Sequence, residues 1–145
     1  MSHIAIPILL LALLSPACTH SAGPAKRVEP ADLGAPFTLA LEETRSISGA
    51  EGLAIRFSRV VTDSRCPADT VCVWAGEVVA AFEVRAGGGA ATEVQLALPA
   101  GSHPGAATVE GHTLTLQAVE PYPKLKSPAS KKDYRATVRV DRAKG

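Results

Sequence analysis

Apolar and polar residues alternate with a period of two through most of the chain after residue 35. Successive side chains of a β-strand point to opposite faces, so this alternation is typical of strands that bury one face. No segment sustains the 3.6-residue period of an amphipathic helix. The sequence therefore predicts an all-β fold, an antiparallel β-sandwich or partly open barrel of roughly six to eight strands. The sets expected to face inward are Phe37, Leu39 and Leu41; Leu53, Ile55 and Phe57; Val78, Ala80, Phe82 and Val84; Val94, Leu96 and Leu98; Leu114 and Leu116; and Tyr134, Ala136, Val138 and Val140.

Two parts of the chain resemble each other at a fixed offset of 59 residues. In both parts the alternation breaks before its last apolar residue, as a β-bulge would break it. Chance remains an alternative, because any two alternating strands align to some degree. A genuine repeat predicts two β-β-loop-β units, with the cysteine-containing loop and loop 120–133 at equivalent places. The aligned residues are Phe37, Leu39, Gly52, Ile55, Phe57 and Val60 with Leu96, Leu98, Gly111, Leu114, Leu116 and Val119; the third strands, from Val78 and Tyr134, align at an offset of 56.

Residues 1–17 have the character of a signal peptide. Their almost wholly apolar segment, 4–14, has the length of a signal h-region and is too short to cross a bilayer as a helix. The segment before Cys18 resembles a bacterial lipobox, although Ser15 stands where Leu is usual. This resemblance implies that Cys18 is lipidated and begins the mature chain. Ordinary cleavage after Ala17 or Gly23 and a buried membrane helix are the alternatives.

Residues 18–35 are small, polar and rich in Pro and Gly, which predicts a lipidated Cys18 followed by a flexible tether. A single β domain is expected over residues 36–145. By resemblance to Gram-negative lipoproteins, Thr19 after the cysteine favours an outer-membrane lipoprotein facing the periplasm. A secreted or soluble periplasmic protein is the alternative. The net charge of +1 argues against nucleic-acid binding, which usually needs a concentrated basic patch.

The three cysteines leave one thiol unpaired in an exported chain. Lipidation of Cys18 accounts for it and leaves Cys66 to pair with Cys72. We expect this disulfide to be structural and to stabilise the fold by roughly 2 kcal/mol. A redox pair is disfavoured because the five-residue spacing differs from Cys-x-x-Cys. A thiolate metal site and a calcium site at Asp63, Asp69 and Glu77 are further alternatives, but the ligand spacings are missing, so no metal or cofactor is expected.

Polar and aromatic side chains gather in the two long loops. Asp63 and Asp69 are expected to accept hydrogen bonds from backbone amides in turns, and Arg65 to pair with one of them. Trp74 is expected to pack over the disulfide, with a role as a ligand platform as the alternative. Tyr122, held extended between two prolines, either packs against the sheet edge or forms a rigid contact. The candidate recognition surface comprises Asp63, Arg65, Asp69, Trp74, Tyr122, Lys124 and Lys126.

The stretch Asp63-Ser-Arg-Cys-Pro67, followed by Cys72-Val-Trp-Ala-Gly76 and by Glu120-Pro-Tyr-Pro123, resembles a group of small bacterial exported proteins and predicted lipoproteins. The resemblance covers most of residues 36–141. It implies export and a disulfide, and it implies no reaction.

No Gly-x-Ser-x-Gly elbow or comparable catalytic motif is present. The sequence therefore predicts a non-enzymatic binding or structural module of the bacterial envelope, held at the membrane by its lipid anchor. Its expected partner is an envelope protein or an anionic envelope polymer, because the loop carrying Lys124 and Lys126 is basic. A periplasmic inhibitor or chaperone-like protein that presents the disulfide loop is the first alternative, and a thiol redox enzyme is the second.

Overall fold

The computed structural model describes residues 28–144, so the predicted signal peptide, the predicted lipidation site Cys18 and the predicted tether up to residue 27 lie outside the described residues. Over the described range the chain forms two sheets and one short 3-10 turn, η1 (Lys131–Asp133). The all-β prediction is confirmed. Residues 28–144 contain no helix with the length and apolar character needed to cross a bilayer. The strands are β1 (Ala31–Asp32), β2 (Pro36–Ala40), β3 (Thr44–Ser48), β4 (Ala54–Asp63), β5 (Val78–Arg85), β6 (Thr92–Leu98), β7 (Ala106–Val109), β8 (His112–Glu120) and β9 (Arg135–Arg142).

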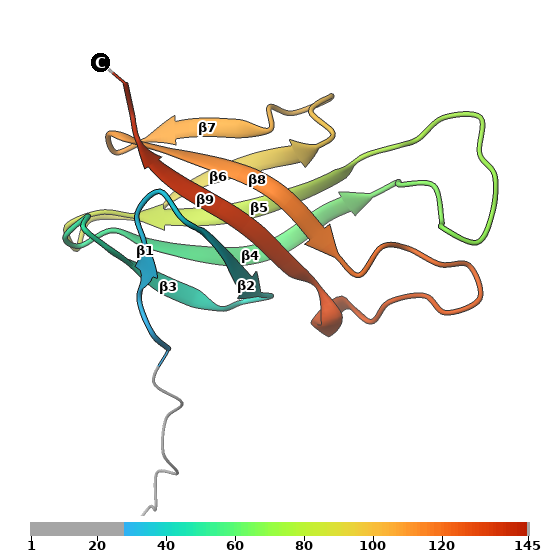
Figure 1. Ribbon diagram of the computed structural model, residues 1–145, viewed down its shortest axis with the longest axis horizontal. Helices are drawn as coiled ribbons and strands as arrows, with labels where there is room; N and C mark the ends of the chain where they lie inside the picture. Colours follow the sequence, from blue (N-terminus) through green and yellow to red (C-terminus); the bar gives the residue numbers. More distant parts are fainter. Residues whose placement is uncertain (1–27, 145) are drawn as a thin grey trace, which may run out of the picture.

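The two sheets lie face to face (Figure 1). One has the strand order β1-β3-β4-β5-β6 and the other the order β2-β9-β8-β7. All neighbours are antiparallel except β1, which runs parallel to β3. The core lies between the sheets because the alternating strands of both sheets turn their apolar side chains inward. Within one sheet, Phe57 of β4 and Phe82 of β5 stack in this core with ring centroids 5.3 Å apart.

The internal repeat is present, with one more strand in each unit than expected. β4 pairs with β5 as β8 pairs with β9, placing Phe57 opposite Phe82 and Leu116 opposite Val138. The register of β4 slips just after Phe57, and that of β8 slips just after Leu116, 59 residues later. β3 and β7 extend the two units in the same way, on β4 and β8 respectively. Both halves of the chain therefore build the same bulged antiparallel unit.

The first strand of each half crosses to the sheet of the other half. β2 pairs with β9, and β6 pairs with β5. Phe37 lies opposite Val138, and Val94 lies opposite Phe82, so Val94 is the equivalent of Phe37. The alignment of Phe37 with Leu96 was therefore displaced by two residues, which alternation alone does not reveal because it repeats every two residues.

The folded part begins before residue 36. Ala31 and Asp32 pair with Ile47 and Ser48 of β3, and the side chain of Ala31 belongs to the core. The expectation that the tether extends to residue 35 is wrong for residues 31–35. Their small, polar composition suits an edge strand of two residues as well as it suits a linker.

Candidate functional site

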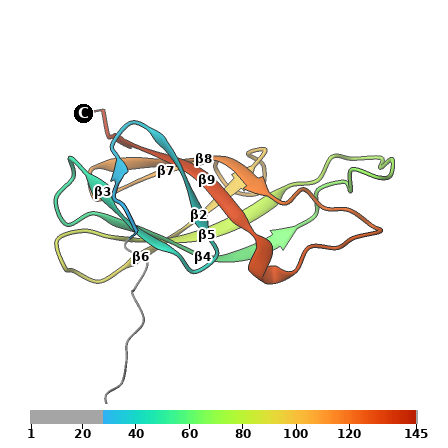
Figure 2. The same cartoon turned by 60° about the horizontal axis from the view of Figure 1, so that its bottom comes forward.

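Two long loops project beyond the sheets at the same end of the molecule (Figures 1 and 2, right-hand side). We call residues 64–77, between β4 and β5, the disulfide loop. Residues 121–134, between β8 and β9, are the proline loop. They meet because β4–β5 and β8–β9 are equivalent hairpins in facing sheets. The structure thus brings together the two segments that hold the sequence-predicted site residues.

Arg65 joins the bases of both loops. Its Nε and Nη2 donate to the two carboxylate oxygens of Asp63, at 2.8 and 2.7 Å. Nη1 donates to the carbonyl oxygen of Val119 at 2.6 Å, and Nη2 also donates to that of Pro121 at 3.1 Å. The guanidinium carbon lies 4.6 Å from the ring centroid of Tyr122, a cation–π distance. One side chain therefore fixes the end of β8 and the start of the proline loop against β4.

Asp63 completes this buried group. Its Oδ2 accepts a hydrogen bond from the hydroxyl of Tyr134 at 3.0 Å, across from the start of β9. Burial opposes ionisation of Asp63, but the hydrogen bonds and charge of Arg65, together with the Tyr134 hydroxyl, outweigh it and lower its pKa below the ordinary value. The predicted pairing of Arg65 with an aspartate is confirmed.

We expected Asp63 and Arg65 to lie on a recognition surface, but the structure buries both side chains. Only 8% and 6% of their side chains are exposed, because both turn inward under the loops. They hold the loops in position and have little surface to offer a partner. The burial of this pair could not be predicted from its local sequence, because the groups that cover it belong to β8 and the proline loop, more than 50 residues away.

Asp69 ties the outer parts of the two loops together. Its Oδ1 accepts from the backbone N–H of Leu125 at 2.8 Å, and its Oδ2 from that of Lys126 at 3.1 Å. These two hydrogen bonds lower the pKa of Asp69. The backbone N–H of Ala68 also donates to the carbonyl oxygen of Pro123, at 2.9 Å. Asp69 binds backbone amides as expected, but they belong to the other loop.

The disulfide Cys66–Cys72 is present, as expected, with Cα atoms 5.8 Å apart. Cys66 is half-buried and its backbone N–H donates to the carbonyl oxygen of Ala75, whereas Cys72 is exposed. Gly76 closes the loop with φ +67°, and a Cβ there would collide with the carbonyl oxygen of Ser64. Glycine therefore lets the two arms of the disulfide loop approach each other.

Four large apolar side chains on the two loops are exposed to solvent. Val71 is 96% exposed, Val73 88%, Trp74 81% and Leu125 65%. We call these four residues the apolar tip. Individual exposed apolar residues are ordinary, but four large ones on two adjoining loops make these loops a candidate interaction site.

The expectation that Trp74 packs over the disulfide is wrong. The aromatic ring that lies against the base of the loop is that of Tyr122, stacked on Arg65, and the indole is left in solvent, beside a hollow that it lines with Glu77 and Pro99. Sequence reasoning did not select Val71, Val73 or Leu125. The available sequence signal was the run Val71-Cys-Val-Trp74. It lies in a segment without the alternation of a strand, so the pattern does not predict which of its side chains are buried.

Tyr122 stacks on the guanidinium of Arg65, and 44% of its surface remains exposed. Lys124 and Lys126 flank Leu125 and are exposed. Within residues 28–144 neither lysine takes part in a salt bridge. The loop end therefore presents apolar and cationic groups side by side.

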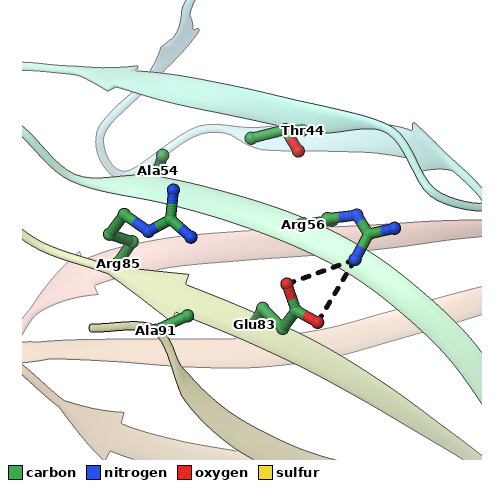
Figure 3. Close-up of a pocket in the computed structure, with 6 residues that line it drawn as sticks. All are labelled: Thr44, Ala54, Arg56, Glu83, Arg85 and Ala91. Carbon is green, nitrogen blue, oxygen red and sulfur yellow. Dashed lines mark hydrogen bonds and ion pairs between the residues drawn. The ribbon is translucent and has the colours of Figure 1, made fainter. Parts of the chain in front are cut away.

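A second hollow lies on the outer face of the β3–β4–β5 sheet (Figure 3). In it, Nη1 of Arg56 donates to both carboxylate oxygens of Glu83, each at 3.2 Å. Arg85, Thr44 and small side chains complete the lining. An ion pair in a shallow, partly exposed hollow neutralises itself and contributes little. We therefore place the candidate site at the loop end.

No group of three His, Cys, Asp or Glu side chains within the described range is arranged to hold a metal ion. His103 donates to or accepts from its neighbour Ser102, with 2.9 Å between Nδ1 and Oγ, far in sequence from either cysteine.

Comparison with known proteins finds no family model that matches the chain, and no significant match among curated proteins or solved structures. The residues of the loop end are therefore the basis for assigning a function.

Proposed function

We propose that the protein is a non-enzymatic binding module of the bacterial envelope that recognises its partner through the apolar tip. The observation that carries this proposal is the exposure of Val71, Val73, Trp74 and Leu125 on loops held rigid from below. Exposing large apolar side chains to water is unfavourable, so a cluster of them is retained where a partner covers it.

The preformed loops support recognition. Asp69, the Cys66–Cys72 disulfide and Arg65 hold both loops in place before a partner arrives. A segment that is ordered in advance loses less conformational entropy on binding than a free one. The loop end therefore combines an apolar contact surface with a rigid support, the arrangement that binding loops on β scaffolds commonly use.

The test is site-specific photo-cross-linking of the full chain in its own envelope. A photoreactive residue replaces Val73 in one variant. In a matched control it replaces Val61, a 43% exposed valine on β4 outside the tip. We expect a discrete cross-linked product from position 73 that the Trp74→Ala substitution abolishes. Equal labelling from positions 73 and 61, or none from position 73, would contradict the proposal.

Stability must be followed in the same variants. Because the indole of Trp74 is exposed, Trp74→Ala should change the free energy of unfolding by no more than about 0.5 kcal/mol. A lost cross-link in a stably folded variant then reports lost binding. A Trp74→Ala protein that fails to fold would show instead that the indole is structural.

We also propose that Cys18 carries the lipid anchor and that the domain faces the periplasm from the outer membrane. The apolar segment 4–14 and the small residues before Cys18 support this. Growth with labelled palmitate should label the chain, and Cys18→Ala should remove the label. Persistent labelling of the Cys18→Ala chain would refute the assignment.

A second candidate function is a periplasmic inhibitor or chaperone-like protein that presents the disulfide loop. The observation in its favour is that Val71, Val73 and Trp74 follow one another within or beside the ring closed by Cys66 and Cys72. An inhibitor predicts that envelope peptidase activity falls as intact protein is added in stoichiometric amounts. A thiol redox function predicts instead a bond that mild dithiothreitol opens in the folded protein.

A further inference from the structure

The apolar tip is a projection. Exposures of 96% and 88% leave Val71 and Val73 almost without neighbouring atoms. Trp74 follows them on the disulfide loop, and Leu125 lies on the proline loop, where its backbone N–H donates to Asp69. Figures 1 and 2 show both loops extending past the ends of the strands. A projection of this kind suits insertion into a yielding surface, whereas a small-molecule site is concave.

The small size of the apolar tip favours a lipid surface over a protein as the partner. A stable protein interface usually takes about 20–30 residues from each side. The tip offers four exposed apolar side chains, and its surroundings are the charged ends of the same loops. A lipid surface has no such size requirement, because acyl chains and headgroups rearrange around whatever is inserted.

The charge around the tip is suited to an anionic surface. Lys124 and Lys126 are exposed on either side of Leu125. Asp69 is also exposed, but its two carboxylate oxygens accept hydrogen bonds from the backbone amides of Leu125 and Lys126. The other acids of the loops behave alike: Glu77 accepts from the Ser102 amide and Asp133 from the Ser130 amide.

We infer that the apolar tip inserts into the headgroup region of an anionic phospholipid surface. The indole of Trp74 has the amphipathic character that favours the membrane interface, with Val71, Val73 and Leu125 entering below it. Lys124 and Lys126 remain at the level of the lipid phosphates and pair with them. The inference depends on the proposed function, because it names the partner of the same tip.

The experiment uses the full chain and the fluorescence of Trp74, which is the only tryptophan in the sequence. Vesicles of phosphatidylglycerol mixed with phosphatidylcholine are compared with vesicles of phosphatidylcholine alone. We expect the emission to move to shorter wavelength with the anionic vesicles, and brominated acyl chains to quench it. Sedimentation with vesicles is not decisive, because the apolar segment 4–14 can itself partition into lipid; the indole reports on the tip alone.

Charge variants test the role of the lysines. The double variant Lys124→Gln, Lys126→Gln should bind anionic vesicles about fivefold more weakly for each lysine removed. A matched control removes two exposed cations elsewhere, Arg85→Gln and Lys144→Gln, and should leave the Trp74 titration unchanged. Val71→Ser with Val73→Ser keeps the probe and should reduce the spectral shift. Unfolding midpoints confirm that each variant is folded.

An unchanged Trp74 spectrum with anionic vesicles overturns the inference, and so does an equal shift with phosphatidylcholine alone. The two proposals fail separately. If position 73 cross-links to a protein while the Trp74 spectrum ignores vesicles, the tip is a recognition surface for protein and not for lipid. If position 73 gives no product with either protein or lipid, the proposed function fails as well.

Discussion

Arg65 donates to one carboxylate and two backbone carbonyl oxygens while its guanidinium lies against the ring of Tyr122. Such a set of donors in one plane suits arginine and no other side chain, because a lysine ammonium cannot reach several acceptors in fixed directions. At the scale of single residues, the geometry of the whole loop end is therefore carried by a buried arginine rather than by the exposed residues that surround it.

Removing this guanidinium should be costly. Arg65→Ala leaves the Asp63 carboxylate buried without its charged partner, and we expect the free energy of unfolding to fall by about 3–5 kcal/mol. Arg59→Ala is the matched control, because Arg59 pairs with Glu93 on the exposed outer face and its loss should cost far less. Urea denaturation followed by circular dichroism measures both. Similar losses in the two variants would show that the Arg65 pair is no more important than a surface pair.

The same pair predicts a dependence on acid. The pKa of Asp63 is lowered in the folded protein, so its ionisation stabilises the fold fully above the unfolded value of 3.8. This contribution is lost as the pH falls from 3.8 toward the lower folded pKa. Asp63→Asn should be less stable at neutral pH and should lose less stability than the wild type between about pH 5 and pH 2. Parallel curves of unfolding free energy against pH would contradict this assignment.

The two loops act as one element because they are hydrogen-bonded to each other, from Arg65 at the base to Asp69 near the tip. Neither loop follows a strand ladder, so each depends on the other for its conformation. The disulfide shortens the free segment of the first loop, and the amides of the second loop complete the turn around Asp69.

Asp69→Ala should separate the outer parts of the loops without unfolding the domain. The backbone amides of Leu125 and Lys126 lose their acceptor and should exchange with solvent faster, by hydrogen-exchange NMR. Asp133→Ala is a matched control on the same loop, because its carboxylate accepts from the local Ser130 amide. Unchanged exchange at residues 125 and 126 in Asp69→Ala would show that the loops keep their positions by other contacts.

At the scale of the whole molecule, each half of the chain supplies the edge strand of the other half's sheet. β2 completes the sheet of β9, and β6 completes the sheet of β5. The core is shared in the same way, because side chains of both halves meet between the sheets. Folding is therefore a property of the complete chain despite its internal repeat.

Fragments 28–88 and 89–144 should each be unfolded alone. Each lacks one of the two strands that pair with its last strand, β6 for β5 and β2 for β9, and the sheet that covers its apolar face. Mixing them should restore β structure, seen by circular dichroism, with a cooperative melting transition. A fragment that melts cooperatively by itself would mean that one bulged unit is an independent domain.

The strands that could be predicted are those in which apolar and polar residues alternate strongly. The long strands could be read from sets such as Ile55 and Phe57, whose burial follows the period of two. β3 was missed because Ile47 is its only large apolar residue. β7 was missed because it consists of alanine, threonine and a single valine. Short strands of this kind are defined by the ladders they join, and not by their own sequence.

For the candidate site, the two loops and Trp74 could be predicted from the sequence, but Val71, Val73 and Leu125 were missed. Charged, aromatic and cysteine residues outside the alternating segments pointed to the two loops, and the structure brings these loops together. Their depth was not predictable, because it depends on contacts between segments about 55 residues apart. Arg65 is buried because Val119, Pro121 and Tyr122 contact its guanidinium, whereas the side chain of Trp74 remains exposed.

The outer segments of the loops, residues 67–74 and 123–130, contribute no side chain to the core between the sheets. Apart from Asp69 and Cys72, which hold the loops in place, substitutions there leave the packing of the sheets untouched and alter the surface that a partner meets. Selection for stability and selection for ligand preference therefore act on different positions of this chain. We expect related sequences to diverge fastest at the exposed positions outside the shared motif, within residues 68–71 and 124–130. We also expect the scaffold to accept new binding specificities by exchange of these segments.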